Sequence, residues 1–235
     1  MTGVIRAAVA LLMLAGTAQA QTISAVRLAE PTARYGHHPM GPGVADHGAL
    51  EIMLDGGERR LIRLPQSRVF EDLTARLVDV TGDGQPEVVV IESDQTQGAR
   101  VSVYGSNGVI AASPFIGQRH RWYAVSGIAD LDGDGTVEIA VVDRPHLRKA
   151  LVIWRREGDR LVAVATLAGV TNHLFGEARI QGGLRFCGSG AEVILARADW
   201  SGLVAVRLVD GALIARDLPG DADAEGFAQA MACGI

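Results

Sequence analysis

The sequence predicts an all-β fold, a small β-propeller with four-stranded blades whose ring is closed by the C-terminal strand. The first observation behind this prediction is a repeat, with spacings of 52 and 53 residues between aromatic side chains. The second is an acidic, glycine-containing loop that leads into a β-branched strand in two of the repeats. The third is that no long segment beyond residue 20 has the 3.6-residue periodicity of an amphipathic helix.

Residues 1–20 have the composition of a secretory signal peptide. Arg6 supplies a positive charge, residues 7–14 form an apolar run too short to span a bilayer, and Ala18-Gln19-Ala20 is a small-x-small cleavage site. We therefore expect cleavage near Ala20 and a single propeller domain at 21–235, located in the periplasm or secreted. No later segment is long and apolar enough for a transmembrane helix, so no membrane span is expected.

The composition narrows the function classes. The chain has 235 residues, 48% of them hydrophobic, and a net charge of -5. This mildly acidic balance argues against a nucleic-acid partner, which requires a basic face, and is compatible with binding cations. Ser189 lacks the G-x-S-x-G frame of a nucleophile and no phosphate-binding loop is present, so no catalytic residue is assigned. We expect a monomer.

Aromatic residues mark the repeats. Their positions are Phe70, Trp122, Phe175 and Phe227, and Tyr35 precedes this series. A glutamate follows each of the first four aromatics in chain order by 16 or 17 residues, at Glu51, Glu87, Glu138 and Glu192. We therefore expect units that begin near residues 35, 70, 122 and 175, and a closing strand at 227–235.

The third unit shows the expected strand pattern most clearly. Its apolar segments, each short enough for a strand, are residues 124–129, 137–142, 150–154 and 161–167. Pairs that tolerate positive φ mark hairpin turns in the other units: Gly56-Gly57, Asn107-Gly108 and Asp210-Gly211. Because one blade cannot bury both of its faces, the units must stack on one another.

The two ends of the chain decide the number of blades. The first unit is shortened and the last unit stops soon after Phe227, so we expect the C-terminal strand to complete a blade begun at the N-terminus. This gives four blades. If residues 22–28 supply a separate outer strand, the ring has five. An open two-sheet sandwich is the alternative fold.

The loop from Asp130 to Glu138 has the oxygen donors of a calcium site. Its alternating positions carry Asp130, Asp132, Asp134, Thr136 and Glu138, with Thr136 supplying its carbonyl oxygen. Calcium takes about six to eight oxygen ligands from carboxylates, carbonyls and water. Carboxylates this close together would repel one another, so a structural Ca²⁺ is the simplest explanation of the arrangement.

A second loop in register with the first has a weaker donor set. Its potential ligands are Asp79, Thr81, Asp83, Gln85 and Glu87. The other two units keep only Glu51 and Glu192, and their loops are not oxygen cages. The alternative to metal binding is that both acidic loops are Asx-type turns before strands, because Asp and Gly are common in turns.

These loops resemble those of a known group. The segment from Asp130 to Glu138 resembles the calcium loop of FG-GAP or VCBS-type repeats, which occur in integrin alpha-like β-propellers, and Phe175-Gly176 matches the Phe-Gly that opens such a repeat. The resemblance covers residues 35–235. It implies calcium in the loops between inner strands and a role in adhesion or ligand binding. Family propellers have more blades than this chain can supply.

The cysteines and histidines complete the set of candidate residues. Cys187 and Cys233 are the two cysteines, and in an oxidising compartment we expect them to form a disulfide that locks the closing seam. A transition-metal site here would use His37, His38 and His47 with Asp46 or Glu51, but the spacing of the histidines fits no established ligand pattern. We therefore interpret these and the other histidines as loop residues.

Two functions follow from these residues. The first is a non-enzymatic, calcium-stabilised binding or scaffold module that recognises a protein or glycan. The second is a calcium-dependent enzyme acting on polysaccharide, which would need an accessible acid–base pair away from the calcium loops. The sequence favours the first, because the repeated carboxylates are better suited to calcium than to catalysis.

Overall fold

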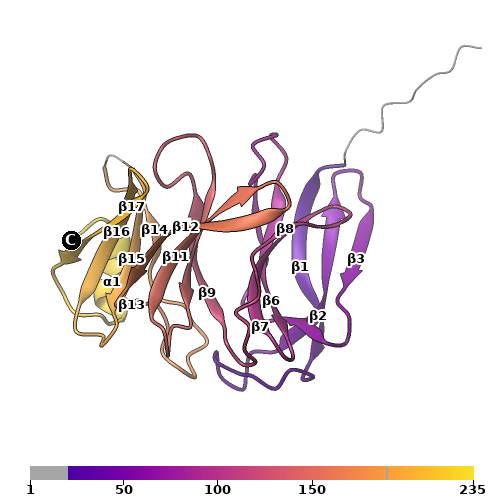
Figure 1. The fold of residues 1–235 in the computed structure, drawn as a ribbon, viewed down its shortest axis with the longest axis horizontal. Coiled ribbons are helices and arrows are strands. Elements are labelled where there is room, and N and C mark those ends of the chain that lie inside the picture. The colour runs from indigo at the N-terminus through magenta and orange to yellow at the C-terminus, as the bar shows by residue number, and fades with distance from the viewer. Residues whose placement is uncertain (1–20, 189) are drawn as a thin grey trace, which may run out of the picture.

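The computed structural model describes residues 21–188 and 190–235. The predicted signal peptide at 1–20 and Ser189 lie outside the described residues. The described chain is all-β apart from one helix, and its two curled sheets give a propeller-like or sandwich-like architecture (Figure 1). Within this part of the chain, no helix has the length and apolarity needed to cross a membrane.

The strands follow one another in antiparallel groups, which we call units one to four. Unit one contains β1 (Ile23–Thr32), β2 (Asp46–Leu54) and β3 (Arg59–Arg63). Unit two contains β4 (Arg68–Phe70), β5 (Arg76–Val78), β6 (Glu87–Asp94), β7 (Gly98–Gly105) and β8 (Gly108–Ala112). Unit three contains β9 (Tyr123–Ala129), β10 (Glu138–Asp143), β11 (Ala150–Glu157) and β12 (Arg160–Ala168). Unit four contains β13 (Val170–Thr171), β14 (Gly183–Arg185), β15 (Glu192–Arg197), β16 (Leu203–Val209) and β17 (Ala212–Leu218).

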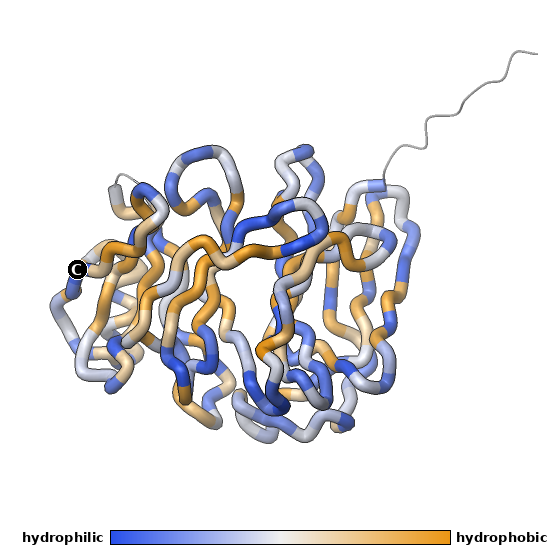
Figure 2. The backbone as a smooth tube through the Cα atoms, in the orientation of Figure 1, coloured by the Kyte–Doolittle hydropathy of each residue, from blue (hydrophilic) through white to orange (hydrophobic). Residues whose placement is uncertain are grey.

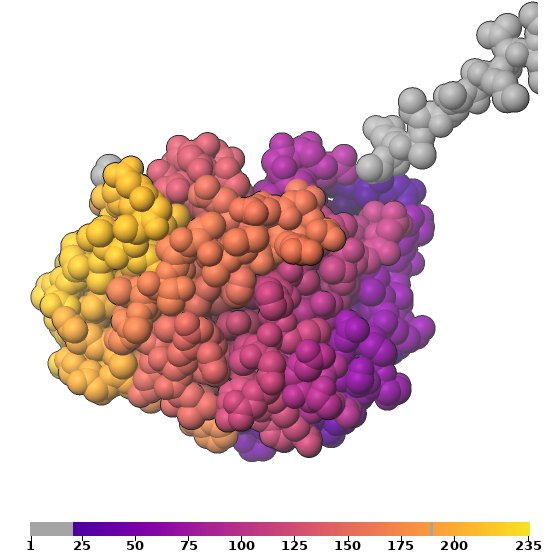
Figure 3. All heavy atoms as spheres, in the orientation of Figure 1, coloured from indigo at the N-terminus to yellow at the C-terminus, as the bar shows by residue number. Residues whose placement is uncertain are grey.

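Narrow edge contacts join the units. Units one to three form a 12-stranded sheet, and unit four forms a separate 5-stranded sheet. β2 meets β4 through the single pair His47–Phe70, and β8 meets β12 through the single parallel pair Ala112–Arg160. Most strand pairing therefore lies inside a unit. The units stand side by side in chain order, from unit one in indigo to unit four in yellow (Figures 1 and 3).

The apolar cores lie between neighbouring units. One core joins Val101 of unit two to Ile139 of unit three, and the next joins Leu151 of unit three to Leu195 of unit four. A third packs unit one against unit two. β6 and β10 are buried along their whole length, because each is covered on both faces. This explains their continuous β-branched runs, visible as apolar segments inside the molecule (Figure 2).

The predicted closing strand at 227–235 is wrong. Helix α1 (Ala224–Met231) occupies this segment, with Asp223 as N-cap accepting a 2.8 Å hydrogen bond from the Gly226 N–H. Phe227 and Ala230 are buried, a spacing that turns one helical face inward. Phe227 keeps the spacing of the aromatic series but not its structural role, so the chain does not close a ring with a C-terminal strand.

The predicted disulfide is confirmed, in a different setting from the one expected. Cys187 and Cys233 are bonded, with their Cα atoms 5.5 Å apart. The bond ties the residues after α1 to the end of β14. Arg185 acts at the same place, because its Nη1 donates to the Ala230 carbonyl over 2.6 Å and to the Ile235 carbonyl over 2.7 Å. The C-terminal segment is therefore fixed to unit four.

Connecting loops from distant parts of the chain meet in one place, which we call the loop junction (residues 33–45, 113–122, 144–149 and 172–182). The His120 N–H donates to Tyr35 Oη over 3.0 Å. The Gly176 N–H donates to the Pro39 carbonyl over 2.8 Å. The second contact brings a loop of unit one to a loop of unit four, although no strand pair among the described residues links these two units.

The double variant Cys187→Ser/Cys233→Ser tests how far the C-terminal segment depends on its covalent link. The bond closes a loop with a sequence separation of 46 residues. If the disulfide acts by restricting the unfolded chain, its removal should lower the free energy of unfolding by about 4 kcal/mol. Residual structure in the denatured state would make this loss smaller. Urea denaturation with and without reductant measures it. Equal stability of the variant and the oxidised protein would contradict the prediction.

Candidate functional site

The acidic loop between β9 and β10 gathers three carboxylates. One oxygen from each of Asp130, Asp132 and Glu138 lies within 4.8 Å of the others. Glu138 is fully buried at the start of β10, whereas Asp132 is exposed. Asp134, also predicted as a ligand, stands outside this group. Its Oδ1 accepts the Thr136 N–H over 2.7 Å, which lowers the pKa of the Asp134 carboxyl.

Main-chain N–H groups hold the first carboxylate of the loop. Asp130 Oδ1 accepts from the Gly133 N–H over 2.7 Å, and Oδ2 accepts from the Gly135 N–H over 2.9 Å. The two glycines have φ values of 83° and 87°, a region that glycine adopts at low cost. The loop is therefore an Asx-type turn, the alternative that the sequence left open, and the same turn points carboxylate oxygens toward a common space.

The loop between β5 and β6 repeats this turn. Its hydrogen bonds run from the N–H groups of Gly82 and Gly84 to Asp79, from Gln85 to Asp83, and from Val80 and Thr81 to Glu87. Thr81 Oγ1 also lies 3.3 Å from Glu87 Oε1. The backbone of the predicted second site thus makes the same turn as that of the first. It does not gather three acidic ligands as the first loop does.

A guanidinium group already sits among the carboxylates of unit three. Arg155, on the neighbouring strand β11, lies 3.0 Å from Asp132, 3.0 Å from Asp134 and 2.5 Å from Glu138. Arg155 could not be predicted from local spacing, because it follows Glu138 by 17 residues and only the β10–β11 pairing, with Glu138 opposite Arg155, brings it to the loop. Arg155 partly neutralises the cluster and would compete with a metal ion.

The glutamates at the start of the central strands differ in their partners. Glu192 pairs with Arg185 at 2.8 Å and with Arg216 at 3.0 Å. Glu87 receives only main-chain and hydroxyl hydrogen bonds, and among the described residues no guanidinium pairs with it. Burial raises the pKa of Glu87, and burial also raises the pKa of Glu138 despite Arg155. Glu87 therefore has no cationic partner among the described residues, whereas Glu138 has Arg155.

The donor set of unit three fits a hard divalent cation. Asp130, Asp132 and Glu138 offer convergent carboxylate oxygens, the ligand type that Ca²⁺ and Mg²⁺ prefer. Asp130 already accepts two main-chain hydrogen bonds, so its remaining lone pairs would face the ion. Arg155 would have to move from Asp132 and Glu138 when an ion binds. A bound ion would supply charge neutralisation and stiffen the loop.

The structure brings together histidines that the sequence left as separate loop residues. His37 stacks on His120 with ring centroids 5.0 Å apart, and the centroids of His146 and His173 also lie 5.0 Å apart. The Trp122 ring packs edge-on against His173 at 5.1 Å. All these histidines belong to the loop junction. Successive members of this group are more than 25 residues apart in the sequence, so no local spacing could reveal the cluster.

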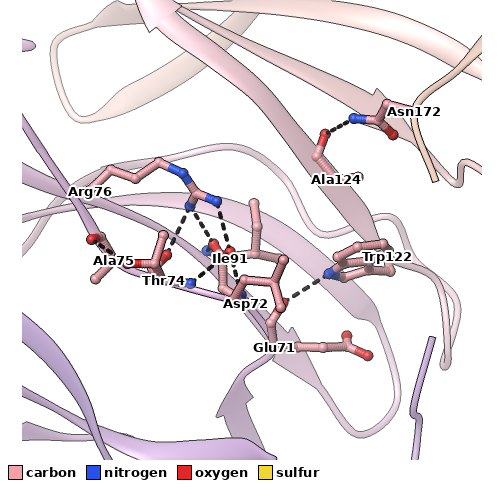
Figure 4. Close-up of polar contacts among 10 residues, drawn as sticks. Glu71, Asp72, Thr74, Ala75, Arg76, Ile91, Trp122, Ala124 and Asn172 are labelled. Carbon is pink, nitrogen blue, oxygen red and sulfur yellow. Dashed lines mark hydrogen bonds and ion pairs between the residues drawn. The ribbon is translucent and has the colours of Figure 1, made fainter. Parts of the chain in front are cut away.

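Two buried acids lie behind this cluster. Glu71 Oε1 is 2.5 Å from His37 Nδ1, and its other oxygen accepts from the Ser93 hydroxyl. The Glu71 carbonyl accepts the Trp122 Nε1–H over 2.8 Å (Figure 4). Burial raises the pKa of Glu71 well above its ordinary value. Burial, together with the charge of Glu71, raises the pKa of Asp46 to about 7. Both side chains are buried from solvent.

Comparisons with known proteins support the repeat resemblance. The family model described as FG-GAP-like repeat matches residues 79–141, which include both acidic loops, and this confirms the predicted repeat type for that segment. No curated protein matches the chain.

Solved structures similar to the chain include the rhamnogalacturonan lyase YesW, at 15% identity and a TM-score of 0.40 over 75% of this chain and 43% of that one. A rhamnogalacturonan lyase of Bacillus licheniformis shares 17% identity, with a TM-score of 0.42 over 78% of this chain and 44% of that one. The chain spans less than half the length of either lyase. Likeness at this level carries no functional argument.

The variant Asp46→Asn tests the buried acids. With a folded-state pKa of about 7 against an ordinary 3.8, the folded protein keeps a proton that the unfolded chain has released. The contribution of Asp46 to the free energy of unfolding should therefore fall as the pH rises from 4 to 7. Asn does not ionise, so the stability of the variant relative to wild type should rise by roughly 2 kcal/mol over this window and stay level above it.

Thermal melts at several pH values measure this difference. Asp159→Asn, in the exposed β11–β12 turn, is the matched control and should follow the wild-type profile. A constant difference between Asp46→Asn and wild type at every pH would show that the Asp46 carboxyl ionises normally.

Proposed function

We propose that the protein is an exported, calcium-binding module of four propeller-like blades, and that it acts by binding a protein or glycan rather than by catalysis. The observation that carries the proposal is the convergence of Asp130, Asp132 and Glu138 in a loop whose backbone shape recurs at Asp79 to Glu87. A repeated acidic turn favours a structural role for the ion, because a catalytic centre needs no second copy.

Calcium would act as a structural cofactor. In unit three it would be held by the three convergent carboxylates, with Asp134 and the Thr136 carbonyl as further oxygens of the same loop. In unit two the oxygens would come from Asp79, Thr81, Asp83, Gln85 and Glu87. Export rests on the composition of residues 1–20, and it would place the loops where calcium is plentiful and the Cys187–Cys233 bond is stable.

The enzymatic alternative has one observation in its favour. Histidines and two acids with raised pKa values gather at the loop junction, away from the acidic loops. Catalysis would require at least one carboxyl within reach of a substrate, yet Asp46 is 2% exposed and Glu71 is 0% exposed. The binding function therefore has the better support.

Calcium should raise the melting temperature and chelation should lower it. At a calcium concentration about 100 times the dissociation constant, the gain is about 2.7 kcal/mol, or about 5 °C or more for a chain of this size. Asp132→Asn removes one convergent charge, and with it the 3.0 Å ion pair to Arg155, while an amide oxygen can still accept the 3.3 Å main-chain hydrogen bond, so most of this shift should disappear. Asp159→Asn is the control and should keep it. Identical melts with calcium and with EDTA would contradict the proposal.

The variant Arg155→Gln tests whether the guanidinium and a metal ion neutralise the same carboxylates. Without calcium the variant should be less stable, by about 1 to 3 kcal/mol, because Glu138 loses its charged partner while it remains buried. With calcium it should bind more tightly than wild type, since no guanidinium has to be displaced. Isothermal titration calorimetry measures the affinity. Weaker calcium binding by Arg155→Gln than by wild type would show that the guanidinium does not compete with the ion.

A further inference from the structure

The loop junction contains a pocket that the acidic loops do not share. Its volume is about 250 Å³, and its lining includes His37, His120, Arg121, Trp122, Arg144 and His146. The acidic loop of unit three precedes β10 and His146 follows β10, so the two sites lie at opposite ends of that strand. A ligand in the pocket would therefore not touch the carboxylates proposed for calcium.

The hydrogen bonds of the junction fix the tautomers of two histidines. His173 Nε2 lies 2.8 Å from the Glu177 carbonyl, which can only accept, so this nitrogen carries the proton. Burial lowers the pKa of His173, so its ring is neutral and Nδ1 is an acceptor. The 2.8 Å contact of that Nδ1 with His146 Nε2 then places a proton on His146 Nε2.

His146 consequently offers a bare acceptor. Burial lowers the pKa of His146 to about 4, so the ring is neutral and its Nδ1 has no proton. Among the described residues, no group hydrogen-bonds to this Nδ1, and the atom is not fully buried. It is therefore reachable by solvent in a residue that lines the pocket, and it can accept a hydrogen bond from a hydroxyl group of a ligand.

Positive charge surrounds the same pocket. Arg121 and Arg144 line it, and Arg119, Arg148 and Lys149 lie on the same two loops. The acid closest in sequence, Asp143, is already engaged by Arg144 at 2.8 Å and by Arg148 at 2.5 Å. A cationic rim on a chain whose net charge is -5 is a local feature that favours anionic ligands.

The backbone holds two of the lining residues in an unfavourable conformation. His120 has φ 56° and Arg144 has φ 48°, both in the left-handed region. This region is unfavourable for a residue with a Cβ atom. Such strain persists where surrounding contacts enforce it, and it is concentrated at binding sites. At His120 the enforcing contact is the hydrogen bond from its N–H to Tyr35 Oη.

The pocket also has an apolar side. Trp122 is buried with its Nε1 committed to Glu71, and it therefore contributes ring surface (Figure 4). Phe175 packs edge-on against His146 with centroids 5.3 Å apart, yet 69% of it is exposed. An aromatic ring this exposed gains apolar burial when a ligand covers it.

We propose that the loop-junction pocket binds a small carboxylate that carries a hydroxyl group beside a flat apolar face. Arg121 faces the carboxylate, His146 Nδ1 accepts the hydroxyl proton in a hydrogen bond, and Phe175 covers the apolar face. This site is independent of the acidic loops, so it does not rest on calcium binding.

Mandelate is the probe, because it combines a carboxylate, a hydroxyl and a phenyl ring. Binding is followed by the imidazole Hε1–Cε1 NMR signals, and we expect a dissociation constant of about 1 mM or lower. Mandelamide, which lacks the charge, should bind at least roughly tenfold more weakly. Phenylacetate, which lacks the hydroxyl, should bind at least roughly threefold more weakly.

Three variants assign the contacts. Arg121→Gln should weaken mandelate at least roughly tenfold and leave mandelamide unchanged. Arg179→Gln, an exposed arginine of the junction outside the pocket lining, is the control and should change neither. His146→Phe keeps a ring against Phe175 but removes the acceptor, so mandelate and phenylacetate should bind it equally.

Two results would overturn the proposal. One is the absence of shifts in the His146 signal with mandelate up to about 10 mM, where a millimolar site would be mostly filled. The other is equal binding of mandelate and mandelamide by the wild-type protein. Both measurements use the native protein, so a folding defect in a variant cannot obscure them. Repeating the titration in EDTA should leave the affinity unchanged, which separates this site from the calcium proposal.

Discussion

The neutralisation of a buried glutamate is the constraint around which three of the units are built. The central strands β6, β10 and β15 each begin with one, at Glu87, Glu138 and Glu192, and all three are at most 8% exposed. These strands are buried because cores press on both of their faces, and a carboxylate there is costly without a partner. Unit four supplies Arg185 and Arg216, unit three supplies Arg155, and unit two supplies only main-chain N–H groups and a hydroxyl. The three units thus stabilise the buried carboxylate in different ways, and the hydrogen bonds of the acidic loops are one of them.

Much of this architecture could be predicted from the sequence, because it is expressed in local patterns. The strands of unit three and the three hairpin turns follow from apolar runs and from pairs that accept positive φ, and the Cys187–Cys233 pairing follows from compartment and number. The C-terminal helix was missed because Phe227 continued the aromatic spacing, although Asp223 and the Phe227–Ala230 spacing are helix signals.

The contacts that decide the chemistry of the sites could not be predicted in this way. Arg155 reaches Glu138 only through strand register, and His37 reaches His120 only because separate loops meet. Both depend on long-range packing, which no spacing within one unit encodes. The molecule therefore separates its polar chemistry between the acidic loops and the loop junction. In unit three, β10 spans the distance between them as a rigid, fully buried strand.

Helix α1 has a consequence for the row of units as a whole. In β15 the side chains alternate, so that Val193 and Leu195 face unit three, whereas Ile194 and Ala196 pack with Phe227 of the helix. A stack of similar sheets normally ends on an apolar face that invites another sheet, from the same chain or from a second molecule. Here a helix, held by a disulfide and by Arg185, covers that face. The helix therefore occupies the position that a further sheet would take, and the outer apolar face of β15 is buried by an element of a different kind.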